Sequence, residues 1–174
     1  MRTEKITVYT FEELSEDAKN KAIENNIDIN LYQGWWEYIY EDAERVGIRL
    51  NSFDLDRNLH ATGNLLLSAA EVAANILKEH GNSCGTYESA SMFLDIHNPL
   101  FAEYMSCEDE NPDRFIELED ELKDVEDEFL ENLLSDYASI LQKEYEYLYS
   151  DEAIIETLIS NGHEFTQDGI SFHN

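Results

Sequence analysis

Residues 114–149 read RFIELEDELKDVEDEFLENLLSDYASILQKEYEYLY. In this stretch an apolar residue recurs every three or four positions, which is the spacing that places side chains on one side of an α-helix. We therefore predict one long amphipathic helix. Its buried stripe is expected to comprise Phe115, Leu118, Leu122, Val125, Phe129, Leu133, Tyr137, Ile140, Leu141, Tyr145 and Leu148.

Acidic residues fill nearly every position that this stripe leaves free in the first half of the stretch. Like charges at these spacings destabilise a helix by roughly a few tenths of a kcal/mol per pair, and carboxylates four positions apart lie about 5 to 6 Å apart. That distance is close to the spacing of phosphates along a nucleic-acid strand. We predict a partner-binding acidic row made of Glu117, Asp120, Glu121, Asp124, Asp127, Glu128 and Glu131, extended by Asp136, Glu144 and Glu146. The alternative is an acidic face that is merely solvated.

The whole chain shares this acidity. It has 39 acidic and 11 basic residues and a formal net charge of -28, and residues 103–174 alone hold 22 acidic and 3 basic residues. Such a surface repels nucleic acids and anionic membranes, so the expected partner is a basic protein and neither a membrane nor nucleic acid itself. With no apolar signal region and no apolar run of about 20 residues, the expected location is the cytoplasm.

The remaining patterns predict an α+β fold in one domain, residues 1–174. Alternating apolar residues predict strands near residues 3–10, 48–55, 58–67 and 164–172, which we expect to form a small, mainly antiparallel sheet packed against several helices. The last segment is either a single strand or a hairpin with an Asp-Gly turn. Helices are expected after the cap residues Ser15, Ser68 and Ser150, over residues 34–46 before Gly47, and from Thr86 onward. Pro99 and Pro112 are expected at the first turn or the edge of a helix.

Motifs for catalysis or for binding a cofactor are lacking. The histidines are scattered, and no nucleophile-elbow, phosphate-loop or dinucleotide motif occurs, so we expect neither an enzyme nor a cofactor. Cys84 and Cys107 have no C-x-x-C spacing and are predicted to be unpaired buried thiols. No metal site is predicted: Asp54, Asp56 and Asn58 begin a calcium-loop pattern that Leu59 and Leu65 break, and Glu108, Asp109, Glu110 and Asp113 would hold a divalent ion only weakly.

Aromatic residues offer a second kind of binding surface. Trp35 and Trp36 lie among several tyrosines, and such a concentration forms either core or an interface hot spot. Tyr147 and Tyr149 fall outside or at the edge of the apolar stripe and are expected to be available for contact. The alternative function is therefore an interaction module, such as an antitoxin or adaptor, and a wider apolar stripe through Leu130, Leu134 and Ile140 would permit a homodimer.

Three segments carry a resemblance to known proteins: YTFEELSEDAK at residues 9–19, Trp36 with the YEDA helix ending at Gly47, and EFTQDG at residues 164–169. They resemble a group of small acidic proteins encoded by bacteriophages and other mobile elements. This resemblance implies a bacterial cytoplasm. In size and acidity the chain is also similar to antirestriction and anti-CRISPR proteins, which occupy the nucleic-acid grooves of host nucleases. The similarity implies that the chain inhibits a bacterial defence nuclease.

Overall fold

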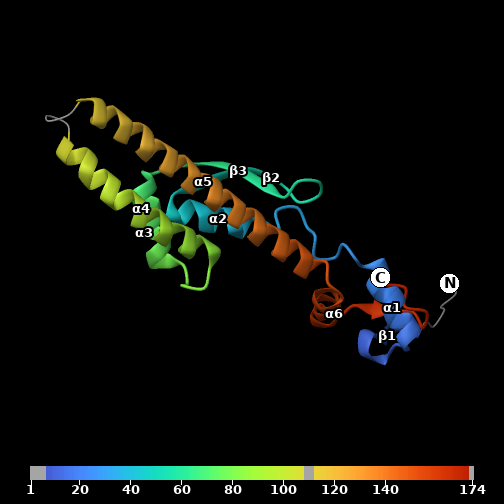
Figure 1. Ribbon diagram of the computed structural model, residues 1–174. Coiled ribbons are helices and arrows are strands. Elements are labelled where there is room, and N and C mark those ends of the chain that lie inside the picture. The colour runs from blue at the N-terminus through green and yellow to red at the C-terminus, as the bar shows by residue number, and fades with distance from the viewer. Residues whose placement is uncertain (1–6, 108–111, 173–174) are drawn as a thin grey trace. The chain divides into compact units, whose positions relative to one another are not determined.

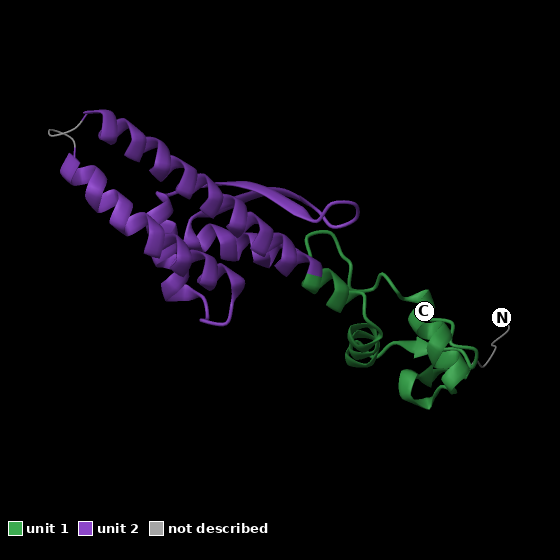
Figure 2. Ribbon diagram, viewed as in Figure 1, with its two compact units in different colours: residues 1–35, 143–174 green, residues 36–142 purple. Residues whose placement is uncertain are grey.

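The computed structural model describes residues 7–107 and 112–172. Their fold is α+β, as predicted, with helices dominating and short antiparallel strand pairs beside them (Figure 1). The chain, which we expected to form a single domain, groups into two compact units. One unit comprises residues 36–142, and the other comprises residues 1–35 and 143–174 (Figure 2). Among the described residues, no helix is both long enough and apolar enough to span a membrane.

The unit of residues 36–142 contains the longest helices. Its elements are α2 (Glu37–Val46), β2 (Ile48–Asp54), β3 (His60–Leu65), α3 (Ala69–Glu79), α4 (Gly85–Cys107) and the larger part of α5 (Pro112–Leu148). Helix α5 confirms the long helix predicted from residue 114 onward. Six members of its predicted apolar stripe are buried in the structure: Leu118, Leu122, Phe129, Leu133, Tyr137 and Leu141.

Strands β2 and β3 form the predicted antiparallel hairpin. Ile48 pairs with Leu65 and Asp54 with His60, and the register shifts between Leu50 and Ser52. Gly47 joins α2 to β2 with a φ of 100°, a left-handed conformation that residues with a side chain rarely adopt. The sequence prediction of a glycine cap at this position is therefore confirmed.

Helices α4 and α5 run antiparallel, side by side (Figure 1). Ser89, near the start of α4, contacts Asp136 in the second half of α5, and Phe93 further along α4 contacts Phe129 in the middle of α5. Pro99 lies inside α4, so the prediction that it marks a helix edge is wrong. Proline lacks a backbone N–H and its ring crowds the preceding turn. The side chains of His97 and Phe101, on either side of it in the chain, stack on each other, and His97 Nε2 lies 3.6 Å from Glu126 Oε1 of α5.

The other unit contains β1 (Tyr9–Thr10), the short 3-10 helix η1 (Phe11–Glu13), α1 (Glu16–Asn25), the end of α5, α6 (Asp151–Ser160) and β4 (Glu164–Phe165). Its core includes Phe11 and Phe165, whose rings meet edge to face with centroids 6.2 Å apart. Ser15 and Ser150 accept hydrogen bonds from the backbone at the starts of α1 and α6, which confirms both predicted caps.

The strands differ from the single sheet that the sequence suggested. They form two separate pairs, β1 with β4 and β2 with β3. Of the two structures predicted for residues 164–172, the hairpin is observed: after Phe165 the chain turns at Gly169 and returns to pair Ser171 with Phe165. The strand predicted over residues 3–10 is observed at Tyr9–Thr10, and its first residues, 3–6, lie outside the described chain.

Candidate functional site

The predicted acidic row lies on one exposed face of α5. Its members follow one another at intervals of one, three or four positions, and the buried stripe occupies the opposite side of the helix. All seven side chains are exposed: Glu117, Asp120, Glu121, Asp124, Asp127, Glu128 and Glu131. We call these residues the acidic face. The structure therefore brings together the seven residues of the predicted row itself.

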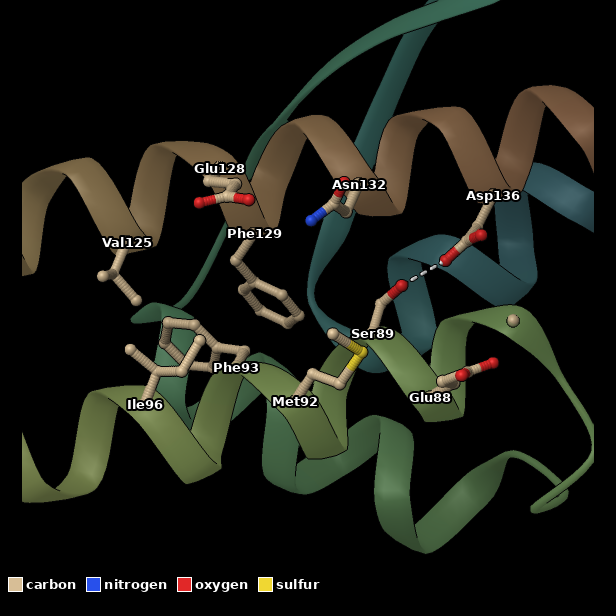
Figure 3. A pocket seen from close by; sticks show the side chains of 11 residues that line it. Glu88, Ser89, Met92, Phe93, Ile96, Val125, Glu128, Phe129, Asn132 and Asp136 are labelled. Carbon is tan, nitrogen blue, oxygen red and sulfur yellow. Dashed lines mark hydrogen bonds between the residues drawn. The ribbon is translucent and has the colours of Figure 1, made fainter.

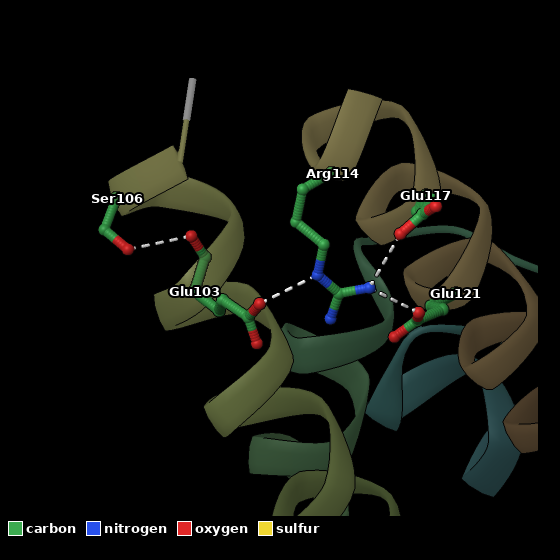
Figure 4. A network of polar contacts seen from close by, with 5 residues as sticks. All are labelled: Glu103, Ser106, Arg114, Glu117 and Glu121. Atoms are coloured by element: carbon green, nitrogen blue, oxygen red, sulfur yellow. Dashed lines mark hydrogen bonds and ion pairs between the residues drawn. The ribbon is translucent and has the colours of Figure 1, made fainter. Parts of the chain in front are cut away.

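One arginine neutralises the beginning of the acidic face. Arg114 Nη1 lies 2.8 Å from Glu121 Oε1 and 3.3 Å from Glu117 Oε2, and Arg114 Nε donates to Glu103 Oε1 of α4 at 2.9 Å (Figure 4). The hydrogen bonds that Arg114 donates, first to Glu103 and then to Glu121 and Glu117, raise the pKa of Arg114. The guanidinium thus ties α5 to α4 and compensates part of the negative charge near residue 117.

The middle of the acidic face has no such compensation. Within residues 7–107 and 112–172, no lysine, arginine or histidine forms an ion pair with Asp120, Asp124 or Asp127. Carboxylates at these spacings repel one another. A basic partner surface would remove that repulsion, and salt would weaken its attraction.

A groove of about 260 Å³ runs between α4 and α5 beside the acidic face (Figure 3). Its apolar side chains are Met92, Phe93, Ile96, Val125 and Phe129. Met92 and Ile96 are 59% and 51% exposed, whereas Phe93 and Phe129 are buried beneath. Its polar side chains are Glu88, Ser89, Glu128, Asn132 and Asp136. Glu128 belongs to both the groove and the acidic face, so the two surfaces are continuous.

Asp136 does not extend the acidic row as predicted. Its carboxylate accepts a hydrogen bond of 2.7 Å from Ser89 Oγ of α4 at one end of the groove (Figure 3). Position 136 lies on the same side of the helix as Leu118 and Val125, because residues seven or eleven positions apart share a side. A Cβ atom on Gly85 would come within 2.8 Å of Asp136 Oδ1, so the missing side chain leaves room for this carboxylate.

A polar cluster that no sequence pattern predicted joins three helices and the turn before α4. Tyr137 OH donates to Asp42 Oδ2 at 3.3 Å, and His80 Nε2 lies 3.4 Å from the same oxygen. The second ring nitrogen of His80, Nδ1, lies 2.8 Å from Thr86 Oγ1. Burial, and then the nearby Asp42 carboxylate, raise the pKa of Tyr137. Tyr137 and Thr86 are almost fully buried, which indicates a structural role for the cluster.

The thiols and the predicted weak metal cluster give no further site. Cys84 is a free thiol, as expected, but it is exposed, so its predicted burial is wrong, and Cys107 is half-buried. It lies in the tight turn before α4, where its N–H donates to the carbonyl of Gly81. No group of three metal-ligating side chains occurs among the described residues. Of the weak acidic cluster, Asp113 is exposed, and residues 108–110 lie outside the described part of the chain.

The aromatic residues considered for a binding surface are partly buried and partly exposed. Trp35 is buried, and Trp36 packs edge to face on Phe53. Tyr147 is 49% exposed, as predicted, and Tyr149 is also exposed. Tyr145, expected in the buried stripe, is instead partly exposed and stacks on Tyr149 with centroids 5.8 Å apart.

Comparisons of the chain with models of known protein families, with curated proteins and with solved structures found no match.

Proposed function

We propose that this protein inhibits a bacterial defence nuclease of the restriction or CRISPR type by binding its nucleic-acid groove through the acidic face of α5. The observation that carries the proposal is the exposure of all seven carboxylates on one face of a single helix. No charge on this face is buried. Arg114 pairs with Glu117 and Glu121, and the other five carboxylates are available to a lysine- or arginine-lined surface.

The dimensions of the acidic face support imitation of a nucleic-acid strand. From residue 117 to residue 131 an α-helix rises about 21 Å. Over that length one strand of B-form DNA carries about six phosphates, and the acidic face presents seven carboxylates. The number and the spacing of negative charges are thus comparable with those of a strand of nucleic acid.

The excess charge of the chain also suits this function. With a formal charge of -28, the protein attracts a basic groove from a distance and repels nucleic acid that competes for it. Association steered in this way is fast and weakens steeply as salt rises. The function requires neither a cofactor nor a reaction.

The experiment compares two charge-reversal variants of the full chain. The first carries Asp120→Lys, Asp124→Lys and Asp127→Lys in the acidic face. The matched control carries Glu37→Lys, Glu41→Lys and Glu44→Lys, which are exposed on α2 at the same spacing and change the formal charge equally. Each tagged protein is incubated with bacterial lysate, and retained proteins are identified by mass spectrometry.

We expect the wild type and the α2 variant to retain a nucleic-acid enzyme at low salt, and the acidic-face variant to lose it. Added DNA or guide-length RNA should displace the enzyme, because the inhibitor and the nucleic acid share one groove. Equal retention by both variants, or a complex that nucleic acid does not displace, would refute the proposal.

The exposed tyrosines favour a second candidate function, an interaction module of the antitoxin or adaptor type. Tyr147 and the stacked pair Tyr145 and Tyr149 offer amphipathic rings of the kind that form interface hot spots. A partner bound there would resist high salt. It would be lost from Tyr147→Ala and retained by the acidic-face variant.

A further inference from the structure

The groove between α4 and α5 has an apolar surface that nothing in its own unit covers among the described residues. Phe93 and Phe129 stack at its base, and Met92 and Ile96 stand above them, one helical turn apart and more than half exposed. Exposed apolar side chains gathered over a buried aromatic pair are typical of a docking surface.

The shape of the groove fits side chains of a helix better than a small molecule. Its volume of about 260 Å³ is below the range of about 300 to 1,000 Å³ usual for small-molecule sites. It extends along α4 from Gly85 to Ile96 and along α5 from Val125 to Asp136, which is about 16 Å in each helix. A partner helix laid along that length presents apolar side chains from about three successive turns.

Polar and aromatic contacts between α4 and α5 fix the two sides of the groove in the free protein. At one end Ser89 donates to Asp136, and beyond the other end Arg114 joins Glu103 of α4 to the acidic face. Tyr104 also stacks on Phe115, with centroids 4.5 Å apart. Because the two helices are fixed to each other, binding need not order them first, which favours affinity.

The charge of the groove determines which kind of partner can bind there. The groove is lined by Glu88, Glu128 and Asp136, and none of its lining residues, all of them described, is a lysine, an arginine or a histidine. A second copy of this chain, with 39 acidic residues against 11 basic ones, would be repelled from the groove. An amphipathic helix with lysine or arginine beside its apolar stripe is complementary to the groove in both polarity and charge.

We propose that the α4–α5 groove binds such a basic amphipathic helix of the partner protein. Apolar side chains of that helix rest on Met92, Ile96 and Val125, and its cations reach Glu88, Glu128 and Asp136. The inference rests on the proposed function in requiring a basic partner, and it adds that the partner is recognised by an apolar contact as well as by charge.

The test uses two fluorescently labelled synthetic peptides of identical composition, built from leucine, alanine and lysine. One places leucine on a single side of the helix with lysine flanking it, and the other distributes the leucines around the helix. Fluorescence anisotropy measures the binding of each peptide to the full-length protein at fixed salt. We expect the amphipathic peptide to bind at least about tenfold more tightly, since burying even one apolar side chain is worth that factor.

Variants then locate the contact. Met92→Ser with Ile96→Ser removes the apolar surface, and Met105→Ser with Ile116→Ser removes side chains of equal type that are 61% and 58% exposed outside the groove. All four side chains are exposed, so the folds should be retained, which circular dichroism checks. We expect the groove variant to bind the amphipathic peptide about tenfold more weakly than the wild type, and the matched control to bind it with unchanged affinity.

The acidic-face variant separates this proposal from the proposed function, because Asp120, Asp124 and Asp127 do not line the groove. Suppose that both peptides bind with equal affinity and that only the acidic-face variant binds them more weakly. Charge alone then governs binding, and the groove proposal is overturned while the acidic-face function stands. If the groove variant alone loses the amphipathic peptide and the nuclease experiment fails, the groove is a binding site without the nuclease function. Unchanged binding in the groove variant also overturns the groove proposal.

Discussion

Phe93 of α4 stacks nearly face to face on Phe129 of α5, with ring centroids 4.2 Å apart and an angle of 14° between the rings. The two rings are 4% and 2% exposed. They lie midway along the antiparallel helix pair and directly beneath the groove (Figure 3). This buried aromatic contact, together with the hydrogen bond from Ser89 to Asp136, therefore helps to fix the groove and the position of the acidic face.

Replacement of the Phe129 ring should strongly destabilise the unit of residues 36–142. Phe129→Ala removes a buried aromatic side chain and leaves a cavity, so we expect the free energy of unfolding to fall by about 3 to 5 kcal/mol. The control is Phe101→Ala on α4, which removes a ring that is 45% exposed and stacked on His97. It should cost about 1 to 2 kcal/mol. Urea denaturation measures both, and equal losses would contradict the central role of Phe129.

The sequence predicted the parts of this arrangement that local chemistry determines. The apolar spacing of α5, the serine at position 68 and the glycine at position 47 each act within one or two turns of the chain, and the structure agrees with them. The same spacing placed the acidic face, because its seven carboxylates lie on the side of the helix away from the stripe.

Contacts between distant segments were not predictable in this way. Asp136 is acidic like the residues of the acidic row, but its carboxylate accepts a hydrogen bond from Ser89, which is 47 positions away. The cluster of Tyr137 with Asp42 joins residues 95 positions apart. The groove required the antiparallel pairing of α4 with α5, and the proline inside α4 concealed the length of that helix. Pairing of elements depends on packing across the whole unit, which a single periodic pattern does not report.

The ion pairs of Arg114 should stabilise the first turns of α5. Arg114→Gln removes the positive charge that Glu117, Glu121 and Glu103 share, leaving three carboxylates close together (Figure 4). We expect faster hydrogen exchange of the amides of residues 115–121 in this variant, with little change after residue 130. The difference from the wild type should shrink as sodium chloride is raised, because the ion pairs are exposed and screened. A difference that is independent of salt would refute this electrostatic account.

The start of α3 depends on a reciprocal cap. Ser68 Oγ accepts from the N–H of Glu71, and the Glu71 carboxylate accepts from the hydroxyl and the N–H of Ser68. The hydrogen bond from the hydroxyl and then that from the N–H lower the pKa of Glu71. Ser68→Ala should reduce the free energy of unfolding by about 1 kcal/mol. Ser83→Ala, in the exposed turn before α4, is the matched control and should change it by less than about 0.5 kcal/mol. Thermal denaturation of both variants decides whether the cap contributes as the geometry indicates.

Tyr137 should make stability depend on alkaline pH. Burial and Asp42 raise its pKa in the folded protein above the ordinary value of 10.0. The folded state therefore keeps the phenolic proton while the unfolded state loses it. Its contribution is fully present below pH 10 and declines as pH rises above that value, by up to about 1.4 kcal/mol per pH unit.

Tyr137→Phe isolates this contribution from that of the other tyrosines. At neutral pH the variant should lose about 1.5 kcal/mol of stability, because the hydrogen bond to the Asp42 carboxylate is removed. Above pH 10 its free energy of unfolding should fall less steeply than that of the wild type, so the two curves converge and then cross. Denaturant titrations at pH 8, 10 and 11 measure the difference. Parallel curves across this range would mean that the Tyr137 hydroxyl is not held protonated by its buried position beside Asp42.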